Sequence, residues 1–419
     1  MRGIHATRGR RAGRVVRVAL VTLLVLAAAG CWGQPGFGPL HQGFNPFEDD
    51  LTPANVATLH VAWTAQVDDG PVRSDPVVSG AGLIHVSDDE AVYGLAQSDG
   101  GRRWRRQVVP AGQPDEAVLS PVSTEGDRVH VAWGGVPDAG ARVELDARTG
   151  TPVRTAGGLG VEAITLRSPV LATAFSGFIE GTLAGTGFGV EGVARPWGLT
   201  FVLEVAPKLR APTGPAVTST RLFVGIERSW FGSDILGGWD LEPGCAGVPN
   251  PPLCAPQVKT QLDGLPTGPV VTDDEQTVFV GTDAGTLYAI NAATGAVRWR
   301  AALGSAIVQQ PALTQSTLYV TTSGGRLVTL PAAGCGMATC TPTRSTPLAG
   351  APTRAPAVAG GVVYVASVGG TLEAFSAAAP GAALFTDDLG AEITGGPTIA
   401  AGRLLVGTAA GEVVAYTPN

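Results

Sequence analysis

Residues 278–300 read VFVGTDAGTLYAINAATGAVRWR, and this stretch decides the fold. Apolar and polar residues alternate up to a turn at 283–285, alternate again up to a second turn at 294–295, and continue to Trp299. Alternation with a period of two indicates half-buried β-strands, and glycine in the turns suits tight hairpins. The stretch therefore predicts three consecutive antiparallel strands.

The spacing of four residues in this stretch recurs elsewhere in the chain. The first set is Ala289, Asn291, Gly295 and Trp299; the others are Gly94, Ala96, Gly100 and Trp104, and then Glu144, Asp146, Gly150 and Arg154. The preceding pair of strands also recurs, at 318–330, 363–375 and 404–416. The chain is therefore expected to be built from repeats.

A proline that follows a small or polar residue and precedes apolar residues marks the start of each repeat. These prolines are Pro76, Pro121, Pro169, Pro215, Pro269, Pro311, Pro356 and Pro397, with gaps of 41 to 54 residues. Repeats of about 40–50 residues are typical of four-stranded propeller blades. The spacing predicts an all-β, eight-bladed β-propeller of antiparallel blades, and its regularity disfavours the alternative of two sandwich domains.

The two ends of the chain are predicted to close the ring. The last repeat stops at Asn419 after three strands, and the segment 59–67, LHVAWTAQV, is a single strand that carries Trp63. This strand would supply the fourth strand of the last blade, and closure removes exposed sheet edges.

These features resemble the pyrroloquinoline-quinone-type β-propeller repeat family. Its blade motif is Ala-x-Asp-x-x-Thr-Gly-x-x-x-Trp, which Ala289 to Trp299 match with Asn291 in place of Asp. The stretch 32–64 also resembles the N-terminal lead-in of that family. The resemblance implies that blades dock through the motif residues, which here are Trp63, Trp104, Ala289, Asn291, Gly295 and Trp299.

The N-terminus has the pattern of an export signal. Six arginines and no acidic residue within the first 17 residues precede an apolar run at 18–29, and Gly30-Cys31 follows. Small residues directly before a cysteine resemble the lipobox of bacterial lipoproteins, which implies acylation of Cys31; an ordinary signal peptide with an incidental cysteine is the alternative. We expect a signal peptide at 1–30, a lead-in at 31–56 and the propeller at 57–419.

Composition and charge exclude several classes of protein. The chain has 59 Gly and 32 Pro but only 15% charged residues, which argues against a disordered chain. Loss of residues 1–30 removes six arginines and no acid, so the net charge falls from −7 to −13. Nucleic acid as a partner is therefore not expected, and attachment to a membrane would depend on the acyl chains of Cys31.

Four cysteines remain after Cys31, in two local pairs. Cys245 and Cys254 form one pair, and Cys335 and Cys340 form the other. Close pairs in an exported protein predict disulfides, with local pairing as the simplest connectivity. Zinc binding is the rival interpretation, and the absence of a nearby histidine disfavours it. Each pair would fasten a loop between the third and fourth strands of its blade.

No catalytic motif stands out in the sequence. Within the resembling family, a dehydrogenase would hold pyrroloquinoline quinone and calcium on the propeller axis. Residues just before the proline markers are expected to face that axis, which makes Asp75, Arg167, Gln310 and Arg354 possible ligand contacts. However, no vicinal cysteine pair and no carboxylate set for a metal can be placed, so no cofactor is expected.

We therefore expect a non-catalytic cell-envelope lipoprotein on the outer side of a bacterial cytoplasmic membrane or in the periplasm. It would act as a scaffold or binding module, with a protein partner bound through the propeller loops. A quinone-dependent dehydrogenase that oxidises alcohols or sugars is one alternative. A sensory or polysaccharide-binding module is the other.

Overall fold

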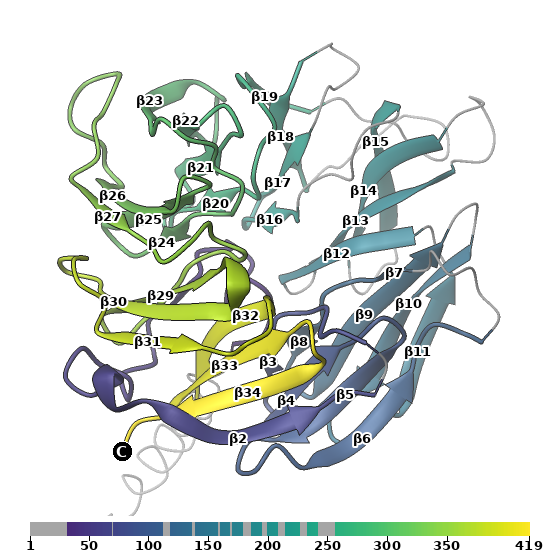
Figure 1. Ribbon diagram of the computed structural model, residues 1–419. Helices are drawn as coiled ribbons and strands as arrows, with labels where there is room; N and C mark the ends of the chain where they lie inside the picture. Colours follow the sequence, from purple (N-terminus) through teal and green to yellow (C-terminus); the bar gives the residue numbers. More distant parts are fainter. Residues whose placement is uncertain are drawn as a thin grey trace, which may run out of the picture.

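The strands of the chain form a ring of sheets around a common centre (Figure 1). The computed structural model describes residues 32–68, 70–111, 118–135, 139–157, 160–167, 170–178, 186–194, 199–207, 214–226, 233–241 and 256–419. Within these residues the strands make eight sheets, in which most neighbouring strands are antiparallel and close in sequence. The prediction of an eight-bladed β-propeller is confirmed.

Blades 1 to 4 occupy the first half of the ring. Blade 1 holds β3 (Val77–Val78), β4 (Leu83–Ser87), β5 (Ala91–Ala96) and β6 (Arg102–Gln107). Blade 2 holds β7 (Val118–Leu119), β8 (Ser123–Glu125), β9 (Arg128–Gly135), β10 (Ala139–Asp146) and β11 (Pro152–Gly157). Blade 3 holds β12 (Gly160–Arg167), β13 (Val170–Phe178), β14 (Thr186–Ala194) and β15 (Leu199–Pro207). Blade 4 holds β16 (Ala216–Val217), β17 (Arg221–Ile226), β18 (Ile235–Asp240) and β19 (Val258–Gln261).

Blades 5 to 8 complete the ring. Blade 5 holds β20 (Val270–Val271), β21 (Thr277–Gly281), β22 (Thr286–Asn291) and β23 (Val297–Ala302). Blade 6 holds β24 (Ala312–Leu313), β25 (Thr317–Thr322), β26 (Arg326–Pro331) and β27 (Arg344–Pro347). Blade 7 holds β28 (Ala357–Ala359), β29 (Val362–Ser367), β30 (Thr371–Ser376) and β31 (Phe385–Asp388). Blade 8 holds β32 (Ile393–Ala400), β33 (Arg403–Thr408) and β34 (Glu412–Thr417).

The N-terminal strand β2 (His60–Gln66) closes the ring. It pairs antiparallel with β34, from His60 opposite Thr417 to Gln66 opposite Glu412. Figure 1 shows this purple strand lying along the yellow C-terminal strand. The predicted closure from both chain ends is therefore confirmed, and blade 8 gains the outer strand that its own segment lacks.

The lead-in before β2 contributes to the interior of the ring. Trp32, Leu51 and Val56 are buried in the same apolar cluster as residues of blades 1, 2, 7 and 8. The lead-in also forms β1 (Phe44–Asn45), which pairs parallel with β28, and a three-residue 3-10 turn at Val56–Thr58. A second 3-10 turn lies at Val368–Gly370 in blade 7.

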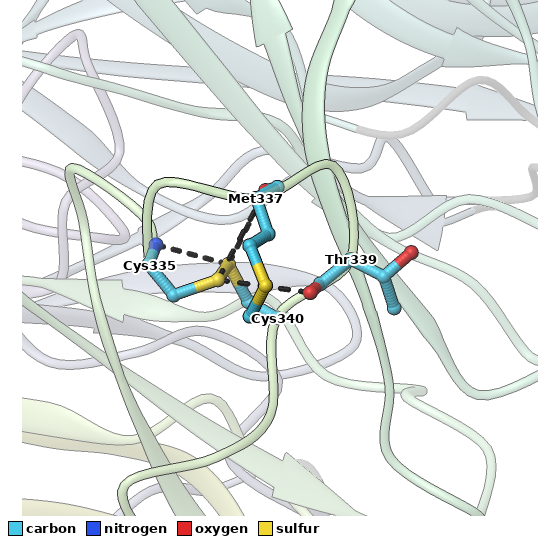
Figure 2. The surroundings of a disulfide bond; sticks show 4 residues. All are labelled: Cys335, Met337, Thr339 and Cys340. Carbon is cyan, nitrogen blue, oxygen red and sulfur yellow. Dashed lines mark hydrogen bonds between the residues drawn. A yellow bond between two sulfur atoms is a disulfide. The ribbon is translucent and has the colours of Figure 1, made fainter.

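A disulfide joins Cys335 and Cys340 in the loop between β26 and β27 of blade 6 (Figure 2). This is the predicted loop between the third and fourth strands. The same loop also pairs with blade 5, since the Arg300 amide donates to the Ala338 carbonyl at 3.0 Å and the Cys340 amide donates to the Arg300 carbonyl at 2.8 Å. The disulfide therefore fixes a contact between two blades. Cys31, Cys245 and Cys254 lie outside the described residues.

Candidate functional site: the axial channel

A cavity of about 230 Å³ lies where the first strands of the blades converge. Four of the marker prolines line it, together with part of the lead-in. They are Pro121, Pro311, Pro356 and Pro397 from the blades, and Trp32, Gly36, His41 and Gly43 from the lead-in. The chain thus lines its own axial channel with an N-terminal segment.

The lead-in is held in this channel by a circular series of hydrogen bonds. Backbone amides near the start of the blades donate to successive lead-in carbonyls, so that the chain order of the lead-in follows the order of the blades. The pairs are Val78 to Trp32 (2.8 Å), Thr124 to Gly33 (2.5 Å), Val217 to Pro39 (2.8 Å), Val271 to Leu40 (3.0 Å), Leu313 to Gln42 (2.7 Å) and Val358 to Gly43 (2.8 Å).

Asn45 makes the corresponding contact with blade 8. Its side-chain amide donates to the Ile399 carbonyl at 2.8 Å, and the residue is fully buried. Backbone groups in an interior must find partners, and these contacts satisfy both the lead-in carbonyls and the otherwise open edges of the first strands. The lead-in is therefore part of the fold and of the channel wall.

Two of the four channel residues expected from the sequence, Asp75 and Gln310, line this cavity. Each is engaged by backbone: Asp75 Oδ1 accepts the Gly396 amide at 2.8 Å, and Gln310 Nε2 donates to the His41 carbonyl at 2.5 Å. Both side chains thus join neighbouring segments of the channel wall. Arg354 lies outside the cavity, in an adjoining pocket, and the side chain of Arg167 is outside the described part of the structure.

Two described histidines are buried and keep a low pKa: His41 lines the axial cavity, and His85 lies in β4 of blade 1. Burial lowers the pKa of His41 to about 4, partly offset by its hydrogen bond with Gln310. Burial also lowers the pKa of His85 to about 3, and its Nε2 lies 2.9 Å from Ser79 Oγ. Imidazoles that stay neutral behave as packed polar groups. They add no positive charge to the axis.

The described residues that line the axial cavity do not fit a quinone with bound calcium. Calcium requires six to eight oxygen ligands, several of them carboxylates, and Asp75 is the only carboxylate among these residues. No group of three or more His, Cys, Asp or Glu close enough for a metal occurs among the residues that the structure describes. The described lining residues also include no arginine or lysine to pair with quinone carboxylates.

The tryptophans of the motif lie where neighbouring blades meet, and Asn291 and Ala289 make contacts within their own blade. The indole Nε1 of Trp104 in blade 1 donates to the Ala147 carbonyl of blade 2 at 2.9 Å. In blade 5, Asn291 Oδ1 accepts the amides of Ala293 and Thr294, and Gly295 follows with φ of 75°. Ala289 is buried opposite Trp299, and Trp299 lies against Gly334 of blade 6.

Sequence reasoning missed the role of the lead-in in the channel. Trp32 and His41 are 2% and 6% exposed, yet neither belongs to the repeat. The available signal was the conspicuous aromatic, Gly and Pro content of 32–47, which the repeat does not explain. The helices within the described residues are the two short 3-10 turns, and neither has the length or apolar character for a membrane crossing.

Most of the chain matches one known protein family. Residues 48–156, 240–334 and 341–419 match the family described as outer membrane protein assembly factor BamB. None of the curated proteins compared matches in sequence.

The similar solved structures include a BamB protein and two quinohemoprotein alcohol dehydrogenases. BamB from Moraxella catarrhalis has a TM-score of 0.59 at 14% identity, covering 86% of this chain and 99% of that one. The quinohemoprotein alcohol dehydrogenase from Comamonas testosteroni has a TM-score of 0.67 at 14% identity, with 97% and 82% covered. The quinohemoprotein alcohol dehydrogenase ADHIIG from Pseudomonas putida HK5 gives 0.68 at 12%, with 95% and 82% covered. At these identities the likeness concerns the fold alone.

Proposed function

The chain belongs to the family described as outer membrane protein assembly factor BamB, and from this premise we propose that it is a non-catalytic propeller lipoprotein of the cell envelope. It would serve as a scaffold or binding module for a protein partner, reached through the loops of the ring. The acyl chains on Cys31 would attach it to the membrane.

One observation carries the non-catalytic part of the proposal. The axial channel, where a quinone would have to sit, is lined by residues of the chain's own segment 32–43, and its described lining offers one carboxylate and no arginine or lysine. The hydrogen bonds of the lead-in to blades 1, 2 and 4 to 7 make it an integral part of the wall. Displacing this segment would leave those buried amides and carbonyls without partners, which is costly.

The position of Trp32 limits the distance between the ring and a lipid anchor on Cys31. It is the residue after Cys31, it is 2% exposed, and its carbonyl is bonded to blade 1. Consecutive Cα atoms are about 3.8 Å apart, so an acyl-modified Cys31 would have almost no free tether. The end of the ring that carries the lead-in would then lie against the membrane, and the opposite end would face a partner.

Membrane fractionation of a C31S variant tests the anchor. The wild-type protein is expected in the membrane fraction and the variant in the soluble fraction of the envelope, because removal of the thiol removes the acylation site. A C340A variant, which disrupts the disulfide and leaves Cys31 intact, is the matched control and should stay in the membrane. Retention of the C31S variant would refute lipid anchoring.

Reconstitution with pyrroloquinoline quinone and calcium tests the dehydrogenase alternative, which the fold likeness to the two dehydrogenases supports. The proposal predicts neither stoichiometric binding nor dye-linked oxidation of alcohols or sugars. Tight binding of the quinone together with such oxidation would overturn the proposal that the protein is non-catalytic. A D75N variant would then show whether this carboxylate of the cavity contributes.

A further inference from the structure

The charge that the axial cavity offers to a ligand is negative. Asp75 is the carboxylate among its described lining residues, and these residues include no arginine or lysine. His41 also lines the cavity, but burial lowers its pKa to about 4, so its imidazole is neutral at neutral pH. The described lining therefore favours a cation over an anion.

Asp75 uses one of its two carboxylate oxygens to hold the channel wall together. Its Oδ1 accepts the Gly396 amide at 2.8 Å, which is its only hydrogen-bond or ion-pair partner among the described residues. Asp75 is partly exposed, not buried, and a carboxylate has about four acceptor sites on its two oxygens. Its Oδ2 is therefore available to a ligand that enters the cavity.

The arginines next to the cavity do not neutralise Asp75. Arg354 immediately precedes Ala355 of the lining, but it lies in the adjoining pocket and forms no ion pair with Asp75. Arg73 lines the same adjoining pocket, and its Nε lies 2.5 Å from Asp89 Oδ1. The negative charge of Asp75 is therefore left for a ligand.

The rest of the accessible lining is apolar and the cavity is small. Pro35 of the lead-in, Pro121 of blade 2 and Ala355 at the start of blade 7 line it and are partly exposed. The cavity volume of about 230 Å³ is below the range of about 300–1,000 Å³ that is usual for drug-sized ligands. These walls suit a short aliphatic chain and not a large cofactor.

We propose that the axial cavity binds a primary ammonium group on a short aliphatic chain. The ammonium group would donate to Oδ2 of Asp75, and the chain would lie against Pro35, Pro121 and Ala355. A guanidinium pairs best with both oxygens of a carboxylate, and the Gly396 amide already occupies one of them. An ammonium group is a compact charge with three donors and needs only one oxygen.

A lysine side chain of a protein partner carries this chemistry, and in that respect the inference rests on the proposed function. A free alkylamine carries the same chemistry and needs no partner. The test is therefore made first with n-butylamine, by saturation-transfer NMR titration of the full-length protein in a nonionic detergent. The matched probes are 1-butanol, which has the chain without the charge, n-propylguanidine, which presents the cation as a fork, and butyrate, which is an anion.

We expect n-butylamine to bind at least tenfold more tightly than each of the three matched probes, and more weakly as salt is added. A second titration compares the peptide acetyl-Gly-Lys-Gly-amide with its norleucine analogue. Binding of the lysine peptide alone assigns the cavity to a protein partner, whereas binding of n-butylamine without the peptide assigns it to a free amine. A failure of the partner-binding function is thus distinguishable from a failure of the ammonium site.

Three variants locate the site. D75N should weaken n-butylamine binding at least tenfold, and asparagine keeps an oxygen for the Gly396 amide, so the wall stays bonded. A355L narrows the cavity without changing its charge and should weaken n-butylamine and 1-butanol alike. D49N removes an exposed carboxylate of the lead-in that does not line the cavity; it is the charge-matched control and should bind as wild type.

Two results would overturn the inference. The first is no saturable binding of n-butylamine up to roughly 10 mM, which corresponds to less than about 3 kcal/mol of binding free energy. The second is equal binding of n-butylamine and 1-butanol, or n-butylamine binding that D75N leaves unchanged. Circular dichroism of each variant separates a loss of binding from a loss of folding.

Discussion

Trp63 packs its indole directly on Gly100, across the junction between blade 8 and blade 1. A Cβ atom at Gly100 would lie 2.5 Å from Trp63 Cε3, and the indole Nε1 donates to the Gln97 carbonyl at 3.0 Å. The same relationship joins Trp104 to Gly150, where the added Cβ would lie 2.4 Å from the ring. Glycine is thus required at this position by the tryptophan of the preceding blade as well as by the turn.

Substitution of Gly100 by alanine is therefore expected to destabilise the ring. The side chain would be forced into the Trp63 ring, and overpacking of this kind costs about 1–3 kcal/mol. A backbone cost is added because φ at Gly100 is 69°. Urea denaturation followed by tryptophan fluorescence measures the loss of stability.

Gly82 is the matched control for this substitution. Its φ is 72°, and nothing lies within 4 Å of an added Cβ. G82A therefore carries the backbone cost alone, and the difference between the two variants isolates the contact with Trp63. Equal destabilisation by G100A and G82A would contradict the proposed role of the glycine in docking.

The repeat could be predicted from the sequence because its signals are local. The alternation in 278–300 and the marker prolines fix strands and turns, and those strands pair with their neighbours along the chain. Closure by residues 60–66 could be predicted as well, since one blade lacked a strand and one strand lacked a blade. Both predictions depend on the number of strands in each repeat and on the spacing of the repeats, and a single sequence shows both.

The interior of the channel could not be predicted in the same way. Trp32 reaches blade 1 and Asn45 reaches blade 8 through contacts that span up to 354 residues. Such contacts follow no period, so the sequence shows only a segment that the repeat does not explain. Arg354 illustrates the same limit: its position before Pro356 predicts a place on the axis, but the structure puts it in a separate pocket between blades.

The buried histidines should make the protein less stable in mild acid. In the unfolded chain histidine titrates near pH 6.5, whereas burial holds the pKa of His41 near 4 and that of His85 near 3. Between these values the unfolded state binds more protons than the folded state, so stability falls as the pH falls. Each histidine contributes a slope of about 1.4 kcal/mol per pH unit below roughly pH 6.5.

The measurement is the free energy of unfolding in urea at several pH values from 5 to 7. An H85Q variant is expected to show a shallower slope than wild type, by about the contribution of one histidine. H60Q removes a histidine that is exposed on β2 and controls for the loss of a histidine as such. Parallel curves for wild type and H85Q would contradict the prediction.

Removal of the disulfide is expected to destabilise the junction between blades 5 and 6. The crosslink closes a loop with a sequence separation of five, for which the chain-entropy estimate is about 2 kcal/mol. A C335A/C340A variant should lose stability of this order and exchange the backbone amides at positions 300 and 340 faster, because the loop that bonds them is freed.

Hydrogen exchange followed by mass spectrometry checks this prediction. M337A is the control, since Met337 lies in the same loop, is 67% exposed, and is not part of the crosslink. If the amides at positions 300 and 340 exchange as slowly in C335A/C340A as in M337A, the prediction is wrong, because the pairing with Arg300 then holds without the disulfide.

The orientation of the ring on a membrane can be tested within one blade. Ser316 and Ser323 are exposed and flank the six residues of β25, so they lie roughly 20 Å apart at about 3.3 Å per residue. Ser316 is at the end where Leu313 bonds to the lead-in. If Cys31 is acylated beside the buried Trp32, a fluorophore on S316C should be quenched by nitroxide lipids more strongly than one on S323C. Equal quenching in a protein that still binds vesicles would refute the orientation while leaving the anchor in place, because vesicle binding and depth are separate readouts.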